Sequence, residues 1–168
     1  SGAAFTAFIR EFDAALKNEY AVTDPGVTLT CAAAEAAKAV PAERTATLVQ
    51  ALAAMPQGVE AMDTDFPGLV QTSLNMGVVK LDGDGLHITF SIRSSIASRK
   101  LMLAQRVRAV AALAGGTVAE RGVYPGWQYK RESKFRDTLL AAYKDLTGKD
   151  GVVEATHGGL ECGLLMEK

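Results

Sequence analysis

The chain has 168 residues, of which 48% are hydrophobic and 22% charged, and its net charge at pH 7 is −1. This size and composition are typical of one large globular domain, or of one domain with a piece of another. Acidic and basic residues are mixed along the chain, which argues against nucleic-acid binding, since that usually needs a basic stripe. No apolar run approaches the ~20 residues that span a bilayer, so we expect no membrane partner.

The cysteines and the chain ends suggest a setting for the protein. Cys31 and Cys162 have neither metal-ligand spacing nor a disulfide pattern, and no signal-peptide layout opens the chain, which favours a cytoplasmic location. The chain begins without Met and stops soon after a glycine-rich segment. We therefore expect it to be a piece of a longer protein, although a processed N-terminus would look the same.

The first third of the chain predicts two helices separated by a strand. An apolar stripe at helical spacing predicts a helix over residues 3–20. Alternating apolar residues predict a strand over 27–33. Pro41 is favourable in a first helical turn, so we expect a second helix from there to about Met55. Residues 59–68, broken by Asp, Pro and Gly, are expected to be irregular.

The next part predicts a hairpin, a helix and a strand. Alternation predicts strands over 69–81 and 86–94. Ser95 or Ser98 can cap a helix that reaches Ala114 and stops at two glycines. A short strand over 117–123 is expected to follow.

These elements give the order β-α-β-β-α-β, which is the ferredoxin-like arrangement within the α+β class. Its four-stranded antiparallel sheet carries helices on one face. We expect an additional helix before it and an αβ segment after it. That last segment contains a helix between Ser133 and Gly148, a strand over 152–155 and a short helix or loop over 160–168.

The two hairpin strands also predict a register. Pairing Met76 with Ile92, and Val78 with Phe90, brings the apolar sets of both strands together on one face. This register leaves a three-residue loop, Gly83-Asp84-Gly85.

The same register sets Asn75 directly opposite Arg93 on the helix-free face, with their Cβ atoms about 4.5–5.5 Å apart. An arginine offers a bidentate fork to a carboxylate, and an asparagine amide can donate to an oxygen. The pair therefore suits an anion next to a carbonyl group. The alternative is that both are ordinary exposed polar residues on a two-sided sheet.

Four sequence blocks in order carry a resemblance to a known family. They are VQTSLNMGVV (70–79), ITFSIRSSIAS (88–98), GVYPGWQY (122–129) and THGGLECGLL (156–165). Together they resemble the bacterial aminoacyl-histidine dipeptidases, also called cytosol non-specific dipeptidases or peptidase D. These belong to the dizinc peptidase family that includes carnosinase and aminoacylase.

The resemblance implies a lid domain inserted into a catalytic α/β domain. Residues 1–125 would be the C-terminal part of the lid, which has ferredoxin-like units and often mediates dimerisation. Residues 126–168 would form the return into the catalytic domain. Tyr124 and Trp127 at this boundary suit packing between domains or, alternatively, substrate stacking.

The resemblance also implies which functional groups this chain lacks. Family members hold two zinc ions through His, Asp and Glu ligands that correspond to neither His87 nor His157 of this chain. The general-base Glu has no counterpart here either. We therefore expect no catalytic and no metal-binding residue in this chain, and no hydrolysis by it alone.

Some substrate-binding positions do carry over. Arg93 matches the lid arginine that grips the substrate's C-terminal carboxylate, whereas Asn75 matches no family role and is only its expected neighbour. His157-Gly158-Gly159 matches a loop that approaches the substrate backbone. Glu161 lies beside that loop. The alternatives are a hydrogen-bonded structural histidine and a carboxylate at a helix N-terminus.

The leading hypothesis is thus a fragment of a zinc-dependent dipeptidase that hydrolyses unblocked dipeptides such as Xaa-His and dimerises through its lid. The alternative is a non-enzymatic ferredoxin-like module for oligomerisation or small-molecule binding. RNA binding by the sheet is disfavoured, because Thr89, Ser91 and Asn75 stand where stacking aromatic residues are needed.

Overall fold

The computed structural model describes the chain except residues 1, 34, 36–37, 159–160 and 166–168. The chain divides into two compact units, Ser1–Val40 and Pro41–Lys168. Helices and an antiparallel sheet are both present, so the predicted α+β class is confirmed. Within the described residues, no helix is long and apolar enough to cross a membrane.

The first unit is built on α1, Gly2–Glu19, which confirms the predicted helix. Phe8 and Phe12 lie one turn apart and stack with ring centroids 5.7 Å apart. The chain then turns back, and the backbone N–H of Leu29 donates to Asp13 Oδ1 at 2.7 Å. The strand predicted over 27–33 is not formed, because the described part of this unit offers no second strand to pair with.

Acid should break the contact between Asp13 and Leu29. The Leu29 N–H, and after it Lys17, lower the pKa of Asp13 from its ordinary value of 3.8. Because the folded pKa is depressed, the contact stabilises the unit above pH 3.8, and this stabilisation is lost as the pH falls through the folded pKa. The Leu29 amide resonance in an NMR acid titration should report that step. Asp13→Asn keeps an acceptor oxygen but should abolish the step, and an identical titration in both proteins would refute the assignment.

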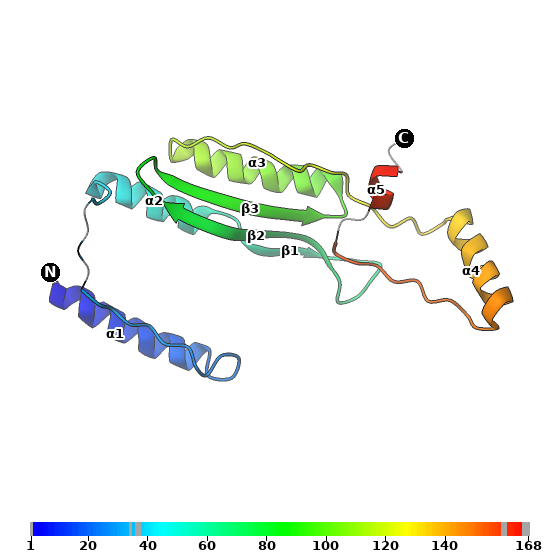
Figure 1. The fold of residues 1–168 in the computed structure, drawn as a ribbon, viewed down its shortest axis with the longest axis horizontal. Coiled ribbons are helices and arrows are strands. Elements are labelled where there is room, and N and C mark those ends of the chain that lie inside the picture. Colours follow the sequence, from blue (N-terminus) through cyan, green and yellow to red (C-terminus); the bar gives the residue numbers. More distant parts are fainter. Residues whose placement is uncertain (1, 34, 36–37, 159–160, 166–168) are drawn as a thin grey trace. The chain divides into compact units, whose positions relative to one another are not determined.

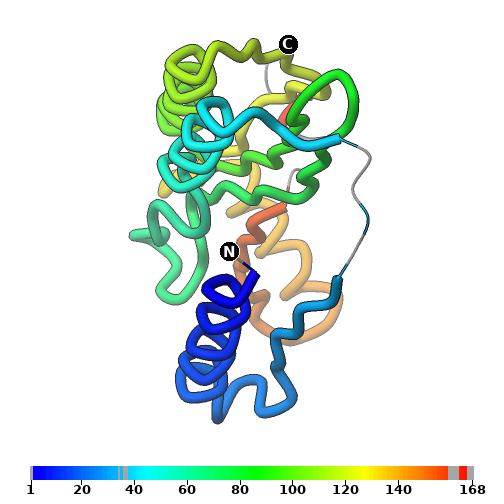
Figure 2. The backbone as a smooth tube through the Cα atoms, turned by 90° about the vertical axis from the view of Figure 1, so that its left-hand side faces the viewer, coloured from blue at the N-terminus to red at the C-terminus, as the bar shows by residue number. Residues whose placement is uncertain are grey.

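The second unit contains a three-stranded antiparallel sheet in the order β1-β2-β3. These strands are Gly58–Met62, Val70–Leu81 and Leu86–Ser94. Helices α2, Ala42–Ala54, and α3, Ala97–Leu113, lie on the same side of this sheet (Figures 1 and 2). The core lies between the sheet and these helices and is small. Its buried hydrophobic residues within the described structure are Leu74, Leu103 and Val107, against which Met55, Phe90 and Ile92 pack.

The hairpin of β2 and β3 forms as predicted, but in a different register. Leu74 pairs with Ile92, and Met76 pairs with Phe90, so the predicted partners are wrong by two residues. Because directly paired residues share a face, the apolar sets still meet on the face toward the helices. Asn75 lies opposite Ser91 and not opposite Arg93.

A β-bulge between Met76 and Val78 and a turn one residue longer than predicted together explain this difference, each shifting the pairing by one residue. The predicted register assumed that the alternation of β2 continued unbroken through Gly77. The extra residue instead shifts the remainder of β2 by one, so that Val79 pairs with Ile88. The turn separately runs from Asp82 to Gly85, in place of the predicted three-residue loop, and the Asp82 N–H donates to the Gly85 carbonyl at 3.0 Å.

The outer strands of the predicted ferredoxin-like arrangement differ from the structure. Residues 117–123 do not join the sheet but run back along α3 (Figure 1), where Arg108 forms an ion pair with Glu120 at 2.6 Å. Residues 152–155 are likewise not a strand. Conversely, most of β1 lies in the segment that was expected to be irregular. The pairing of β1 with β2 contains two register shifts, so this strand lacks the regular alternation by which a strand is predicted.

The helix ends follow the local signals at both ends of α4 but not at the start of α3. Helix α4, Lys134–Thr147, begins with Ser133 Oγ accepting from the Arg136 N–H and ends at Gly148 with φ 70°, as predicted. Helix α3 begins after Ile96, so neither Ser95 nor Ser98 is its cap. The Ile96 N–H is instead bonded by Ser94 Oγ at 3.0 Å. The last helix, α5, covers Glu161–Leu165.

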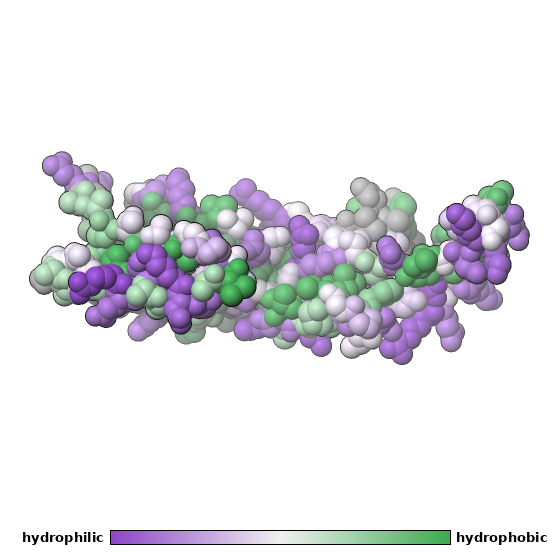
Figure 3. Space-filling model, turned by 90° about the horizontal axis from the view of Figure 1, so that it is seen from below, coloured by the Kyte–Doolittle hydropathy of each residue, from purple (hydrophilic) through white to green (hydrophobic). Residues whose placement is uncertain are grey.

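Many large apolar side chains stay exposed, as the face in Figure 3 illustrates. On α4, Phe135 and Leu146 expose 75% and 87% of their surface. At the far end of the hairpin, Val78 and Leu81 are also exposed. The small buried cluster must therefore supply most of the hydrophobic stabilisation of the sheet and its helices.

Candidate functional site

The helix-free face of the sheet carries the site. Thr72 and Leu74 are buried toward the helices, so the intervening residues of β2 point to the opposite side. Ser73 lies there, directly opposite Arg93 of β3. Arg93 is exposed and forms no ion pair with any described residue.

A distant segment of the chain is bound to this face. After α4 the chain returns toward the sheet (Figure 1), and His157 Nε2 lies 2.7 Å from Ser73 Oγ. The turn that carries His157 is closed by the Gly158 N–H donating to Thr156 Oγ1 at 3.3 Å. The fold thus places Arg93 and His157, two of the predicted site residues, around Ser73.

The charge at this site comes from Arg93. Partial burial lowers the pKa of His157 from its ordinary value, and the nearby Arg93 guanidinium lowers it further. A hydrogen bond with the backbone of Val70 opposes this shift in part. His157 is therefore neutral at pH 7, next to a guanidinium that has no carboxylate partner among the described side chains. A free guanidinium beside neutral hydrogen-bonding groups is suited to binding a carboxylate.

Asn75 does not take its predicted position beside Arg93. It shares the helix-free face but lies diagonally across the strand pair, where such neighbours are about 7–8 Å apart. Its Oδ1 atom is 3.5 Å from Gln57 Nε2, and Gln57 Oε1 accepts from the Met76 N–H at 2.6 Å. Asn75 therefore helps attach the segment before β1 to β2 and does not orient Arg93.

The other predicted site residues are only partly described. A Cβ atom on Gly158 would meet only Thr156 Oγ1, at 3.6 Å, so no contact within the described chain requires glycine there. Gly159 lies outside the described residues. Glu161 is the first residue of α5, and the position of its side chain is not described. A substrate-binding role for these three residues stays a prediction.

A cavity of about 300 Å³ lies at the end of the same face. Gln71, two residues before Ser73 on β2, lines it together with Ser95, Arg99 and Tyr129. The Gln71 Oε1 atom is buried and has no hydrogen-bond partner within the described part of the chain. The sequence prediction overlooked Gln71 and Ser73, although both alternate with Asn75 along one strand face, because the assumed register directed attention to Asn75.

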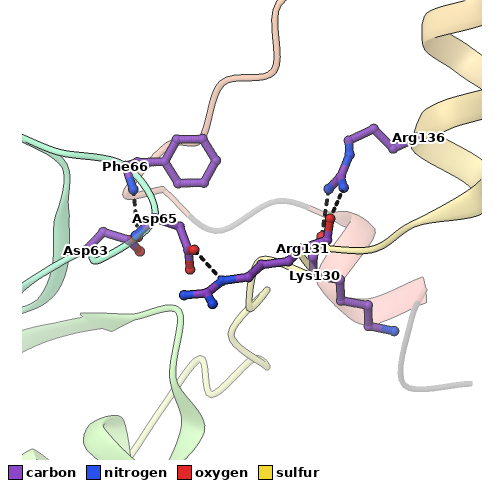
Figure 4. Close-up of polar contacts among 6 residues, drawn as sticks. All are labelled: Asp63, Asp65, Phe66, Lys130, Arg131 and Arg136. Atoms are coloured by element: carbon purple, nitrogen blue, oxygen red, sulfur yellow. Dashed lines mark hydrogen bonds and ion pairs between the residues drawn. The ribbon is translucent and has the colours of Figure 1, made fainter.

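The rim of this cavity is fixed by contacts from α4 and the segment before it (Figure 4). Asp63 Oδ1 accepts the backbone N–H groups of Asp65 and Phe66, and Asp65 forms an ion pair with Arg131 at 2.6 Å. Arg136 donates to the carbonyl groups of Lys130 and Arg131. Arg131 and Arg136 thus make contacts within the protein.

Glycine is required where the segment before α4 crosses the end of β3. A Cβ atom on Gly126 would lie 2.7 Å from the Ser95 carbonyl oxygen and 2.8 Å from that of Ser94. These contacts are closer than any side chain tolerates, so Gly126 allows the crossing that leads the chain to the cavity.

The described residues do not fit a metal centre. They contain no group of three or more His, Cys, Asp or Glu side chains that could hold an ion. His87 Nε2 lies 3.3 Å from Asp82 Oδ1 at the hairpin turn, and His157 is bonded to Ser73. We therefore derive no metal-dependent step from the residues of this chain.

Comparison with known proteins shows that the chain is similar to part of the dipeptidases, which confirms the resemblance carried by the sequence blocks. No family model matches it. It is 32% identical over 157 residues to the cytosol non-specific dipeptidase of Escherichia coli (strain K12). This alignment covers 93% of this chain and 32% of that protein. The crystal structure of aminoacylhistidine dipeptidase from Vibrio alginolyticus matches with a TM-score of 0.82 and 30% identity, over 94% of this chain and 32% of that one. The chain thus spans about a third of the length of these relatives.

Proposed function

We propose that this chain is the substrate-binding part of a zinc-dependent dipeptidase and that Arg93 holds the free carboxylate of a dipeptide. The observation that carries this proposal is Arg93, which is exposed on the helix-free face and forms no ion pair with a described residue, with the His157 turn bound beside it. The dipeptidase relatives support the substrate class, because an unblocked dipeptide ends in a carboxylate that a guanidinium can bind through two hydrogen bonds.

The proposal divides the work between this chain and the remainder of the enzyme. Residues 1–125 belong to the lid, and residues 126–168 contribute the His157 turn from the catalytic domain. Two zinc ions and the general base are supplied by other segments of the enzyme. The enzyme acts in the cytoplasm on dipeptides of the Xaa-His type.

Titration of the isotopically labelled chain with alanyl-histidine tests this function. We expect chemical-shift changes at Arg93, Ser73 and His157, and none on α2, which lies on the other face of the sheet. Added zinc should produce no hydrolysis and no tight stoichiometric binding. Hydrolysis by this chain, or shift changes confined to other surfaces, would overturn the proposal.

We also propose that the lid forms a homodimer. Val78 and Leu81 are exposed at the far end of the hairpin, and exposed apolar side chains of this kind are suited to contact with a second copy of the chain. Light scattering on the purified chain should give twice the monomer mass. A monomer at all accessible concentrations would count against dimerisation through this part of the enzyme.

A further inference from the structure

Among the described residues, the Ser73 hydroxyl makes the one side-chain hydrogen bond between the sheet and the His157 ring. The Ser73 hydroxyl oxygen is 2.7 Å from His157 Nε2, and the Ser73 backbone pairs directly with Arg93. One serine therefore sits between a residue of the lid strands and a residue that is far away in the sequence. A serine hydroxyl can donate or accept a hydrogen bond, so it satisfies Nε2 in either tautomer of the neutral ring.

We propose that Ser73 is a positioning residue, whose hydroxyl fixes the His157 turn beside Arg93 so that the two segments present one binding surface to a dipeptide. This inference rests on the proposed function, because the dipeptide is the ligand that needs both segments at once. Arg93 would hold the carboxylate, while the turn at residues 156–158 would lie next to the peptide backbone. Without the Ser73 hydroxyl, the turn loses its side-chain anchor to the sheet.

The electrostatics of His157 support this role independently of any ligand. Burial against the sheet, followed by the Arg93 charge, lowers the pKa of His157. Both causes require the ring to stay at the sheet face. If the ring were free in solvent, its pKa would return toward the ordinary value of about 6.5.

The test compares Ser73→Ala with Ser91→Ala in the full chain. Ser91 is a matched control, because it is an exposed serine on the same face of the sheet. It pairs with Asn75, and this pair is the next one on that face after Ser73 and Arg93. Two readouts are needed: the His157 pKa from an NMR titration of the ring without ligand, and the affinity for alanyl-histidine. Ser73→Thr keeps the hydroxyl and serves as the rescue variant.

In Ser73→Ala, the His157 pKa should rise toward its ordinary value, and the dipeptide affinity should fall about three- to tenfold, as expected for one lost hydrogen bond. Ser73→Thr should restore both, and Ser91→Ala should change neither. A His157 pKa in Ser73→Ala equal to that in Ser91→Ala would overturn the positioning role. Dipeptide binding by none of the proteins would instead refute the proposed function, and the ring titration would still decide whether Ser73 positions His157.

Discussion

Replacing Arg93 with alanine should weaken the binding of a free dipeptide by about tenfold or more. Hydrogen bonds that involve a charged group contribute about 1.5–3 kcal/mol, and 1.4 kcal/mol corresponds to tenfold in affinity. Arg93 is exposed, so solvent screening places the expected loss near the lower end of that range. The fold should not change, because Arg93 forms no ion pair with the described residues.

Arg121→Ala is the matched control for this prediction, since Arg121 is also exposed and lies outside the described ion pairs. Arg93→Lys keeps the charge but loses the bidentate fork, so its affinity should be intermediate. Calorimetric titration with alanyl-histidine measures all three variants. Equal affinities of the Arg93→Ala and Arg121→Ala proteins would remove Arg93 from the site.

Replacing Leu74 with alanine should lower the free energy of unfolding of the second unit by about 2–5 kcal/mol. Leu74 is 1% exposed and belongs to the small cluster with Leu103 and Val107. The described core holds few other buried side chains, so little can shift to fill the cavity. Such a loss is a large share of the stability of an ordinary domain.

Leu81→Ala offers a control on the same strand, because Leu81 is 57% exposed and should cost much less. Urea unfolding followed by the fluorescence of Trp127, the single tryptophan of the chain, measures both variants within the second unit. Equal midpoints for the two proteins would show that the Leu74 cluster is not the core of the sheet.

The elements predicted correctly from the sequence are those whose signals are local. Helix α1 follows from its apolar stripe, and α4 follows from the cap at Ser133 and the left-handed Gly148. The two hairpin strands follow from alternation over eight or more residues. Each of these signals depends only on neighbours within a few positions of the chain.

The predictions that failed depend on contacts between distant residues. The alternation of β2 contains no sign of the bulge at Gly77 or of the longer turn, so the predicted register and the predicted place of Asn75 are wrong. The strands over 27–33 and 117–123 needed neighbours that their sequences do not determine.

The candidate site divides in the same way. The hairpin pattern and the resemblance both predict Arg93, and the resemblance predicts His157, but their positions around Ser73 become visible only in the folded chain. No local pattern connects a serine in β2 with a turn after α4. The cavity beside Gln71 depends likewise on a crossing made by residues 126–129.

The most direct test of the carboxylate-binding role is to compare alanyl-histidine with its C-terminal amide on the native chain and on Arg93→Ala. The two peptides differ only in the group that Arg93 is proposed to hold. We predict that the native chain binds the free acid about tenfold or more tightly than the amide, and that this preference disappears in Arg93→Ala. Equal binding of acid and amide by the native chain would contradict the proposed function.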